Sequence, residues 1–328
     1  MTNTRHDDNN ANRGPGVRHV DVTRETAGQR IDKFLLGELP GLPRSRVQRL
    51  LRRGEVRVNG GRVRSGARLA PGDRVRIPPV RLPSADPETP EAPPAGLRAA
   101  LEQGIIHEDK RLLILNKPSG VAVHGGSGIR WGAIEVLKAL RPQAPELELV
   151  HRLDRETSGC LVIAKKRSEL RRLHAVLREG GMEKRYLALV QGRLPKHPLP
   201  VEARLDRGAR RQGERTVAVS DSGQHARSVF RRSQVFKDAT LAEVSIETGR
   251  THQIRVHAAH VGHPVAGDQR YGDADWNERL RIAGLRRLFL HASSLRWRVP
   301  DSGAEHVYHA ALPEALDHVL DSLAGRRN

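Results

Sequence analysis

A seven-residue segment contains the densest set of reactive side chains in the sequence: His151, Arg152, Asp154, Arg155 and Thr157. A carboxylate between two arginines stays ionised at neutral pH, because nearby positive charges lower its pKa. Such a carboxylate can act as a nucleophile or a base, and it can equally form a structural ion pair. Spacing alone leaves both interpretations of Asp154 open.

Apolar runs on both sides of this segment predict strands that would hold it as a fixed loop. Leu147–Val150 precedes the segment, and Cys160–Ala164 follows it. Loops held between strands are where proteins often place binding and catalytic groups. A helix is expected after the second strand, capped by Ser168 and with three leucines on its inner face.

The rest of the second half of the chain contains more predicted strands than helices. Strands are expected at Arg111–Leu115, around Tyr186, near Phe230, at Leu241–Ile246 and at Leu288–Leu290, with helices at Ile134–Leu140 and from near Thr251. The two kinds of element do not alternate strictly. We therefore expect an α+β domain with a mixed, largely antiparallel central sheet.

The charge balance of the chain indicates a polyanionic partner. Its 328 residues include 57 Lys and Arg against 38 Asp and Glu, a formal net charge of +19. The longest apolar runs are far shorter than the ~20 residues of a membrane-spanning helix. The polar N-terminus lacks the apolar core of a secretory signal, and the single cysteine, Cys160, fits a reducing compartment. We expect a soluble, cytoplasmic protein that spans no membrane.

Nearly half of the net charge falls between Gln29 and Arg76, where thirteen Lys or Arg face four Asp or Glu. A helix is predicted from Pro43 to Gly54, and Asn59-Gly60 predicts a hairpin turn. The arginines of this helix lack acidic partners at i,i+4, so their charge is available for phosphate binding. The alternative is a solvated surface. The candidate RNA-binding residues are Lys33, Arg44, Arg46, Arg49, Arg52 and Arg53.

This basic stretch resembles an S4 RNA-binding domain. The resemblance rests on Gln29–Leu35, on the run Arg44–Asn59 and on the turn Pro71–Val75. It implies a small αL-type module, two helices with short strands, that binds RNA. The expected organisation is a disordered tail at 1–20, an S4 domain at 21–80, a Pro-rich linker at 81–100, a catalytic domain at 101–322 and a tail at 323–328.

Four ordered blocks, His151–Gly159, Glu183–Gly192, Thr248–His257 and Arg287–Ala292, resemble the RluA-type family of RNA pseudouridine synthases. The resemblance implies that uridine is isomerised to pseudouridine: the bond from N1 to C1′ breaks, the base turns, and C5 joins C1′. This chemistry needs neither metal nor cofactor, but the base must leave the RNA stack. The implied partner is large-subunit ribosomal RNA, and neither DNA nor a membrane is expected as a partner. The sequence does not encode an oligomeric state, so a monomer is the simplest expectation.

The same resemblance implies roles for five residues. Asp154 supplies the essential carboxylate, Tyr186 stacks on the flipped uracil and assists removal of the C5 proton, and Arg255 pairs with the carboxylate. Arg152 enters the RNA stack where the uridine has left, and Leu290 packs beneath the site. Three of them have a simpler alternative: an ion pair for Asp154, core packing for Tyr186 and a phosphate contact for Arg152.

Two rival functions belong to other classes. The first is a metal-dependent nuclease whose ligands come from His252, His257, His260 and His263. The first two are five residues apart, so a helix would turn them to different faces. The second rival is a ribosome-assembly factor that binds RNA without chemistry. Against it, the three positions that match the family's catalytic residues keep the expected residue types.

Overall fold

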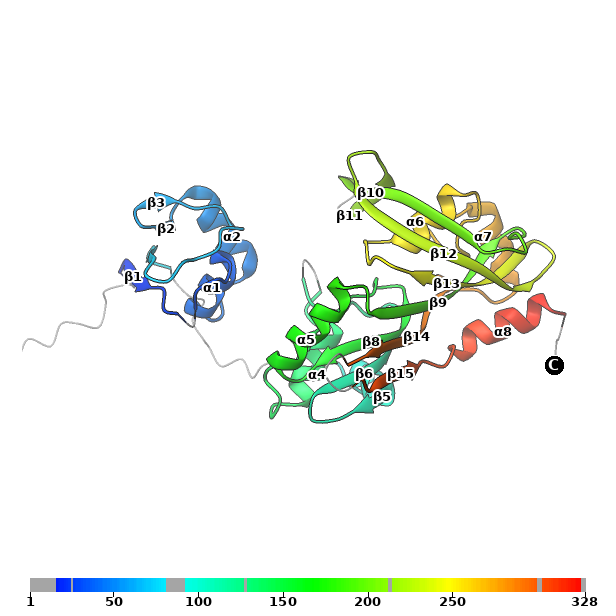
Figure 1. Ribbon diagram of the computed structural model, residues 1–328, viewed down its shortest axis with the longest axis horizontal. Helices are drawn as coiled ribbons and strands as arrows, with labels where there is room; N and C mark the ends of the chain where they lie inside the picture. Colours follow the sequence, from blue (N-terminus) through cyan, green and yellow to red (C-terminus); the bar gives the residue numbers. More distant parts are fainter. Residues whose placement is uncertain are drawn as a thin grey trace, which may run out of the picture. The chain divides into compact units, whose positions relative to one another are not determined.

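The computed structural model describes residues 16–24, 26–80, 92–126, 129–211, 214–299 and 303–325 (Figure 1). The chain divides into an N-terminal unit, Met1–Glu91, and a C-terminal unit, Ala92–Asn328. Within these described ranges, no helix has both the length and the apolar character that crossing a lipid bilayer requires.

The N-terminal unit is a small α+β module. Its elements are β1 (Arg18–Asp21), α1 (Ile31–Glu38), α2 (Arg44–Arg53), β2 (Arg57–Val58), β3 (Gly61–Arg62) and β4 (Arg74–Ile77). The strands form an antiparallel sheet in the order β1-β4-β2-β3. Apolar side chains of both helices and of β4 make one core, in which Ile31, Leu35 and Val47 are almost fully buried.

Two local signals in the sequence determine the turns of this unit. Gly54 ends α2 in the left-handed conformation, with φ at 69°, and its amide bonds to the carbonyls of Leu50 and Leu51. Asn59 and Gly60 also have positive φ, 50° and 79°, and join β2 to β3 in a two-residue turn. The predicted helix end and the predicted hairpin are therefore confirmed.

The C-terminal unit is built around one large sheet. Its strands are β5 (Ile105–Glu108), β6 (Leu112–Lys117), β7 (Glu148–Leu149), β8 (Ser158–Ala164), β9 (Met182–Gln191), β10 (Leu199–Arg211), β11 (Glu214–Val219), β12 (Gln224–Val235), β13 (Ala239–Ile246), β14 (Leu290–Arg298) and β15 (Glu305–His309). Its helices are α3 (Ala95–Gln103), α4 (Ala133–Leu140), α5 (Arg167–Arg178), α6 (Gln253–His260), α7 (Ala274–Ile282) and α8 (Glu314–Leu323).

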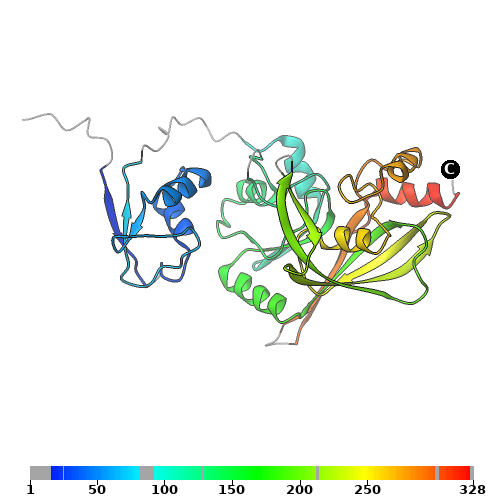
Figure 2. The same cartoon turned by 90° about the horizontal axis from the view of Figure 1, so that it is seen from above.

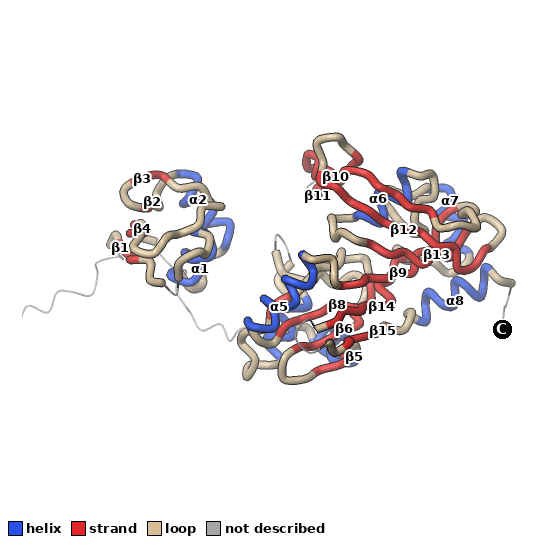
Figure 3. The backbone as a smooth tube through the Cα atoms, viewed as in Figure 1, coloured by secondary structure: helices blue, strands red, loops and turns tan. Residues whose placement is uncertain are grey.

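The strand order across this sheet is β11-β10-β12-β13-β9-β14-β8-β6-β5, with β15 beside β14 and β7 beside β8. Among the described strands, only β14 and β8 pair in parallel, and the remaining pairs are antiparallel. Figure 3 shows the red strands crossing the unit from β10 to β5. The predicted mixed, largely antiparallel sheet is confirmed.

Helices cover both faces of the sheet. Apolar residues of α3, α4 and α6 share a core with β6, β8, β9 and β13 on one face. On the other face, α5 packs against β8 in a second core, and α7 and α8 pack against β9 and β13 in a third. Figure 2 shows α7 and α8, orange and red, beside each other at one end of the unit. The strands between these layers are buried on both sides, and every residue of β8 is buried.

Four sequence-based boundaries need correction. Strand β1 begins at Arg18, inside the predicted tail 1–20. It is a strand because it pairs with β4 in the sheet of the N-terminal unit. Helix α3 begins at Ala95, inside the predicted linker 81–100, because its Leu101 is needed in the core. Helix α5 begins at Arg167 after Lys166, so Ser168 lies within the helix and does not cap it. Strand β14 starts only at Leu290, the last residue of the strand predicted at Leu288–Leu290.

Gly159 provides a test of how closely β8 and β14 approach. A Cβ at this glycine would lie 2.2 Å from the carbonyl oxygen of Ala292, and its φ is +110°. We expect Gly159→Ala to lower the free energy of unfolding by more than ~3 kcal/mol, because two backbones must separate. Gly120→Ala is the matched control: its φ is +81°, yet nothing lies within 4 Å of the added Cβ, so strain of ~1 kcal/mol is expected. Equal losses in chemical denaturation would contradict this explanation.

Candidate functional site

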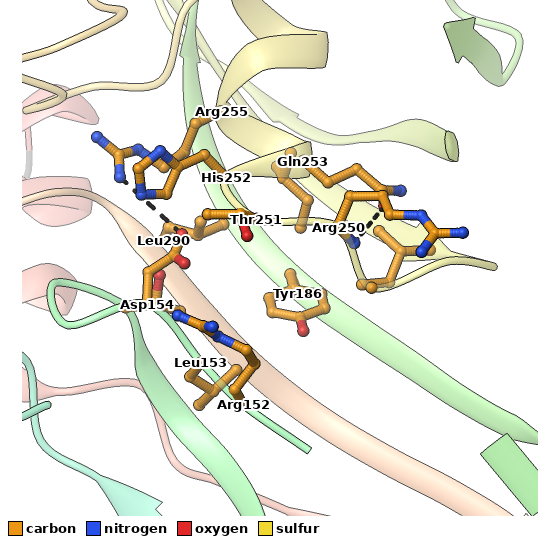
Figure 4. A pocket seen from close by; sticks show the side chains of 14 residues that line it. Arg152, Leu153, Asp154, Tyr186, Arg250, Thr251, His252, Gln253, Arg255 and Leu290 are labelled. Carbon is orange, nitrogen blue, oxygen red and sulfur yellow. Dashed lines mark hydrogen bonds and ion pairs between the residues drawn. The ribbon is translucent and has the colours of Figure 1, made fainter. Parts of the chain in front are cut away.

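The predicted site residues lie around one pocket of the C-terminal unit. Asp154 and Arg152 lie on the connection between β7 and β8, Tyr186 on β9, Leu290 at the start of β14, and Arg255 on α6. All five line the pocket, together with the segment from Gly249 to Ile254 (Figure 4). The sheet thus brings together residues that are more than a hundred positions apart in the sequence.

Buried Lys117 holds the loop that contains Asp154. Its ammonium donates hydrogen bonds to the carbonyl oxygens of Pro118, Val121 and Arg155, at 2.8, 2.8 and 3.1 Å. Burial, together with the nearby charge of Arg287, lowers the pKa of Lys117 to about 7. The turn after β6 is therefore fastened to the backbone one residue beyond Asp154.

A second set of hydrogen bonds fixes the point where this loop enters β8. The buried His291 lies within 3.1 Å of the carbonyl of Ala310 through Nε2, so this nitrogen carries the proton and Nδ1 accepts from the Ser158 hydroxyl at 2.9 Å. Arg287 in turn donates to the Ser158 oxygen at 2.7 Å. The Ser158 hydroxyl and both ring nitrogens of His291 each have a partner of the right kind in this network, which gives the end of the loop one arrangement.

Arg255 has a different main partner from the one that the sequence predicts. Its guanidinium donates two hydrogen bonds to the carboxylate of Asp268, at 2.7 and 2.8 Å, whereas its distance to the Asp154 carboxylate is 3.9 Å. The predicted pairing of Arg255 with Asp154 is thus present only as this longer ion pair, and the two short hydrogen bonds of Arg255 go to Asp268. Asp154 receives only a longer ion pair from the same guanidinium, which leaves its oxygens available to a ligand.

Asp268 is the most buried member of this group. Its side chain has no exposed surface, and one oxygen also accepts the backbone amides of Arg270 and Tyr271. Burial alone would raise the pKa of the Asp268 carboxyl, but the hydrogen bonds and charge of Arg255 outweigh it and hold the pKa below its usual value. Both groups therefore remain charged inside the protein, and Arg255 also lies over the ring of Tyr271.

Tyr186 lies in the same pocket as Asp154, with only 7% of its surface exposed. Burial raises the pKa of its hydroxyl, and the negative charge of Asp154 raises it further, so the phenol is protonated at neutral pH. None of the described residues hydrogen-bonds this hydroxyl. Leu290 is buried in the same core, as expected for a residue beneath the site.

Arg152 is exposed at the pocket and forms no ion pair with any described residue. His151 next to it is turned inward, where its Nε2 accepts the amide of Val162, and burial lowers the pKa of this histidine to about 4. The loop thus presents Arg152 at the pocket, while the histidine next to it is neutral and hydrogen-bonded to β8.

The segment between β13 and α6 closes the pocket opposite Asp154. Buried Gln253 fixes this segment, because its amide oxygen accepts from Thr248 and from the amide of Arg250, while its nitrogen donates to Arg227 and Ser228. His252, just before α6, has φ at 54°.

The basic residues predicted to bind RNA lie on the helices of the N-terminal unit. Arg49, Arg52 and Arg53 on α2 are exposed, as is Lys33 on α1, and Arg46 is partly exposed. Arg53 has a weak partner in Glu55, at 3.8 Å. The backbone of Arg44 begins α2, but its side chain lies outside the described structure.

Three of the four histidines of the rival metal site have different hydrogen-bond partners. Nδ1 of His252 contacts the Tyr271 hydroxyl, Nδ1 of His257 contacts the Ser228 hydroxyl, and Nδ1 of His263 contacts the carbonyl of Gln191. Throughout the described ranges, no three His, Cys, Asp or Glu side chains lie close enough together to hold a metal ion.

Comparison with known proteins identifies both units. The family model described as RNA pseudouridylate synthase matches residues 111–260, and the S4 domain model matches residues 29–75. Two curated relatives are named ribosomal large subunit pseudouridine synthase C. The one from Yersinia pestis is 50% identical over 96% of this chain and 97% of its own length, and the one from Escherichia coli K12 is 49% identical over 95% and 98%.

The chain belongs to the RNA pseudouridylate synthase family. It is thus an RNA pseudouridine synthase with an N-terminal S4 domain. Among solved structures, human RNA pseudouridylate synthase domain containing 4 is similar, with 27% identity and a TM-score of 0.57 over 70% of this chain and 96% of that one. Both sequence resemblances and the fold class they implied are confirmed.

Sequence reasoning missed two residues that organise the site of this pseudouridine synthase. Asp268 lies in a short polar stretch of the sequence, a few residues after α6. Lys117 is the last residue of the otherwise mostly apolar strand β6. An acidic residue amid turn-forming residues is an ordinary surface pattern. The sequence shows that Lys117 is a charged residue at the end of the apolar run of β6, which suggests burial. It does not show which groups the ammonium contacts.

The Arg255–Asp268 pair generates a prediction about stability. We expect Asp268→Asn to lower the free energy of unfolding by about 3–5 kcal/mol, because Arg255 would be left as an uncompensated buried charge. Asp154→Asn is the matched control. Its longer contact with Arg255 and its partial exposure should limit the loss to about 1 kcal/mol. Chemical denaturation of both variants measures the difference, and a larger loss in Asp154→Asn would show that Arg255 depends mainly on Asp154.

Proposed function

We propose that this pseudouridine synthase modifies uridine in large-subunit ribosomal RNA and that Asp154 supplies the essential carboxylate. The observation that carries the proposal is the meeting of Asp154, Tyr186 and Arg255 in one pocket at the centre of the sheet. The printed names of the relatives from Yersinia pestis and Escherichia coli support the choice of RNA. Those relatives are bacterial, so a ribosomal RNA substrate favours the cytoplasm as the place of action.

Asp154 suits this role because it is charged, fixed and not engaged in a tight pair. Its nearest cationic partner, at 3.9 Å, keeps an attractive charge nearby without covering the carboxylate. Arg255 is itself oriented by Asp268, so we propose that it positions and stabilises the charge of Asp154 during the reaction. A carboxylate in this setting can approach the nucleoside.

Tyr186 and Arg152 are proposed to act on the displaced base and on the space that it leaves. The buried ring of Tyr186 offers an apolar face on which uracil can stack. Its raised pKa keeps the hydroxyl protonated, and a neutral phenol is too weak a base to take the C5 proton, so the role proposed for Tyr186 is stacking on the uracil. The exposed, unpaired Arg152 can reach the RNA stack or a phosphate. Leu290 supports the pocket from beneath.

The S4 residues Lys33, Arg46, Arg49, Arg52 and Arg53 are proposed to supply affinity for RNA, with Arg44 at the start of the same helix. They surround an apolar helix face that is fully occupied by the core of the N-terminal unit. This division favours an enzyme that acts as a monomer, with binding and chemistry carried by different units. The rival, an assembly factor without chemistry, does not explain why the pocket keeps a carboxylate, a tyrosine and an oriented arginine together.

Asp154→Asn tests the role of the carboxylate. The variant keeps the shape of the side chain and removes its charge, so turnover should fall by at least about a thousandfold while RNA affinity changes little. Pseudouridine is measured by mass spectrometry of ribosomal RNA from a strain that lacks the protein, supplied with either the parent or the variant. Binding is measured with purified protein.

Two outcomes would contradict the proposal. Substantial pseudouridine formation by Asp154→Asn would remove the carboxylate from the chemistry. An unchanged ribosomal RNA profile in the strain lacking the protein would favour another RNA or the binding-only rival, provided that no second enzyme modifies the same uridines; the purified parent acting on unmodified ribosomal RNA controls for this.

The basic face of α2 can be tested through the salt dependence of binding. Each phosphate contact that is lost should lower the slope of log affinity against log salt by about 0.7 to 0.9. We expect a triple change of Arg46, Arg49 and Arg53 to Gln to weaken binding to ribosomal RNA and to lower this slope by about two. The positions lie on the surface of α2, away from the core, so the N-terminal unit should stay folded.

A control with the same charge change separates phosphate contacts from the overall field of the protein. Arg167, Arg171 and Arg178 are exposed on α5 of the C-terminal unit. Their replacement by Gln removes three positive charges without touching the S4 unit, and we expect a smaller change in slope. Equal changes in both triple variants would mean that α2 is only a solvated basic surface.

A further inference from the structure

His252 is a pocket residue to which the proposed chemistry gives no role. It lines the pocket together with Asp154 and Tyr186, and Figure 4 shows its ring beside Arg255. Its backbone has φ at 54° and ψ at 19°, a left-handed conformation that is uncommon outside glycine. Such conformations persist where the surroundings hold them, and they concentrate at functional sites. Here α6 and the Gln253 hydrogen bonds hold the residue in place.

The hydrogen bonds around His252 determine which of its nitrogens carries the proton. The hydroxyl oxygen of Tyr271 accepts the backbone amide of Val217 at 3.0 Å and lies 2.8 Å from Nδ1 of His252. The hydroxyl proton of Tyr271 then has one acceptor among the described residues, and that acceptor is Nδ1 of His252. In the neutral ring, Nε2 therefore carries the hydrogen.

The ring is neutral at ordinary pH. Burial lowers the pKa of His252, and the charges of Arg255 and Arg152 lower it further, against the opposing effect of Asp154 and Asp268. Nδ1 is turned to Tyr271, and no described residue bonds Nε2, which lies on the other side of the ring. The pocket is thereby provided with a neutral N–H donor of defined direction, close to the carboxylate of Asp154.

We infer that His252 donates a hydrogen bond from Nε2 to a carbonyl oxygen of the flipped uracil, and that it is a specificity-determining residue of this pocket. A neutral donor suits an uncharged acceptor, whereas the exposed arginines suit phosphate. Uracil presents two such acceptors, O2 and O4. The inference rests on the proposed function, because it concerns the same pocket and the same nucleoside.

The first experiment changes the two partners of this hydrogen bond separately: the Nε2–H donor of His252 is removed in the protein, and the uracil carbonyl acceptor is weakened in the RNA. His252→Asn keeps a residue that tolerates the left-handed backbone but shortens the side chain. The substrate is an RNA fragment with the uridine that the ribosomal RNA experiment identifies, or the same fragment with 2-thiouridine or 4-thiouridine there, since sulfur accepts hydrogen bonds more weakly than oxygen. With uridine, kcat/KM should fall about tenfold in the variant.

The response to sulfur decides whether the contact exists. At one of the two thio positions the parent should lose about tenfold in kcat/KM, and His252→Asn should lose little more than it has lost already. Equal sensitivity of parent and variant to both thio substrates overturns the inference alone. A parent that forms no pseudouridine in any ribosomal RNA overturns the proposed function and the inference with it.

A second measurement needs neither substrate nor a stable His252 variant. Two-bond ¹H–¹⁵N correlations of the full-length protein with labelled histidine report which ring nitrogen carries the proton. His252 should show the Nε2–H form, and Tyr271→Phe, which keeps the ring beneath Arg255, should shift it towards a mixture of both forms. That variant should also lower kcat/KM by a few fold. An Nδ1–H form in the parent overturns the inference, since Nε2 would then be an acceptor.

Discussion

The buried pair of Arg255 and Asp268 is the interaction on which the site depends. A guanidinium this far from water must meet a negative charge, and Asp268 meets it through two hydrogen bonds of 2.7 and 2.8 Å. Because Asp268 neutralises Arg255, the Asp154 carboxylate does not have to. Asp154 forms a longer ion pair with Arg255, so its oxygens stay available to a ligand. Asp268, which has no exposed surface, sets the orientation of Arg255.

The sheet gives the opposite wall of the pocket the same rigidity. β8 and β14 run in parallel beside each other, and they approach so closely that only a glycine fits at position 159. Lys117 and the chain of hydrogen bonds through Ser158 and His291 then fix the loop that leads into β8. The carboxylate of Asp154 is exposed to a ligand, yet its backbone is held at both ends. Such positioning by a surrounding framework holds a reacting group in one geometry before a ligand arrives.

The two units of this chain place their charged side chains in different surroundings. The S4 unit carries exposed arginines on a helix whose apolar face is already used by its core, so its charges act over distance and are sensitive to salt. The pocket of the C-terminal unit uses a few charges that are buried and paired, where salt has little effect. His252 extends this contrast, since the inferred contact to uracil comes from a neutral ring whose direction is set by Tyr271.

Local sequence determined the parts of this protein whose causes are local. The Asn59-Gly60 turn, the α2 helix and the reactive segment around Asp154 could all be predicted, because a few neighbouring residues decide them, and the ordered motifs identified the family. Only the tertiary structure decided which charged side chains pair with each other. Arg255 was predicted to pair with Asp154, yet it makes its two short hydrogen bonds to Asp268 and only a longer ion pair with Asp154, because Asp268 is the more deeply buried carboxylate beside it. Burial is a property of the packed sheet and its helices, and no spacing along the chain specifies it.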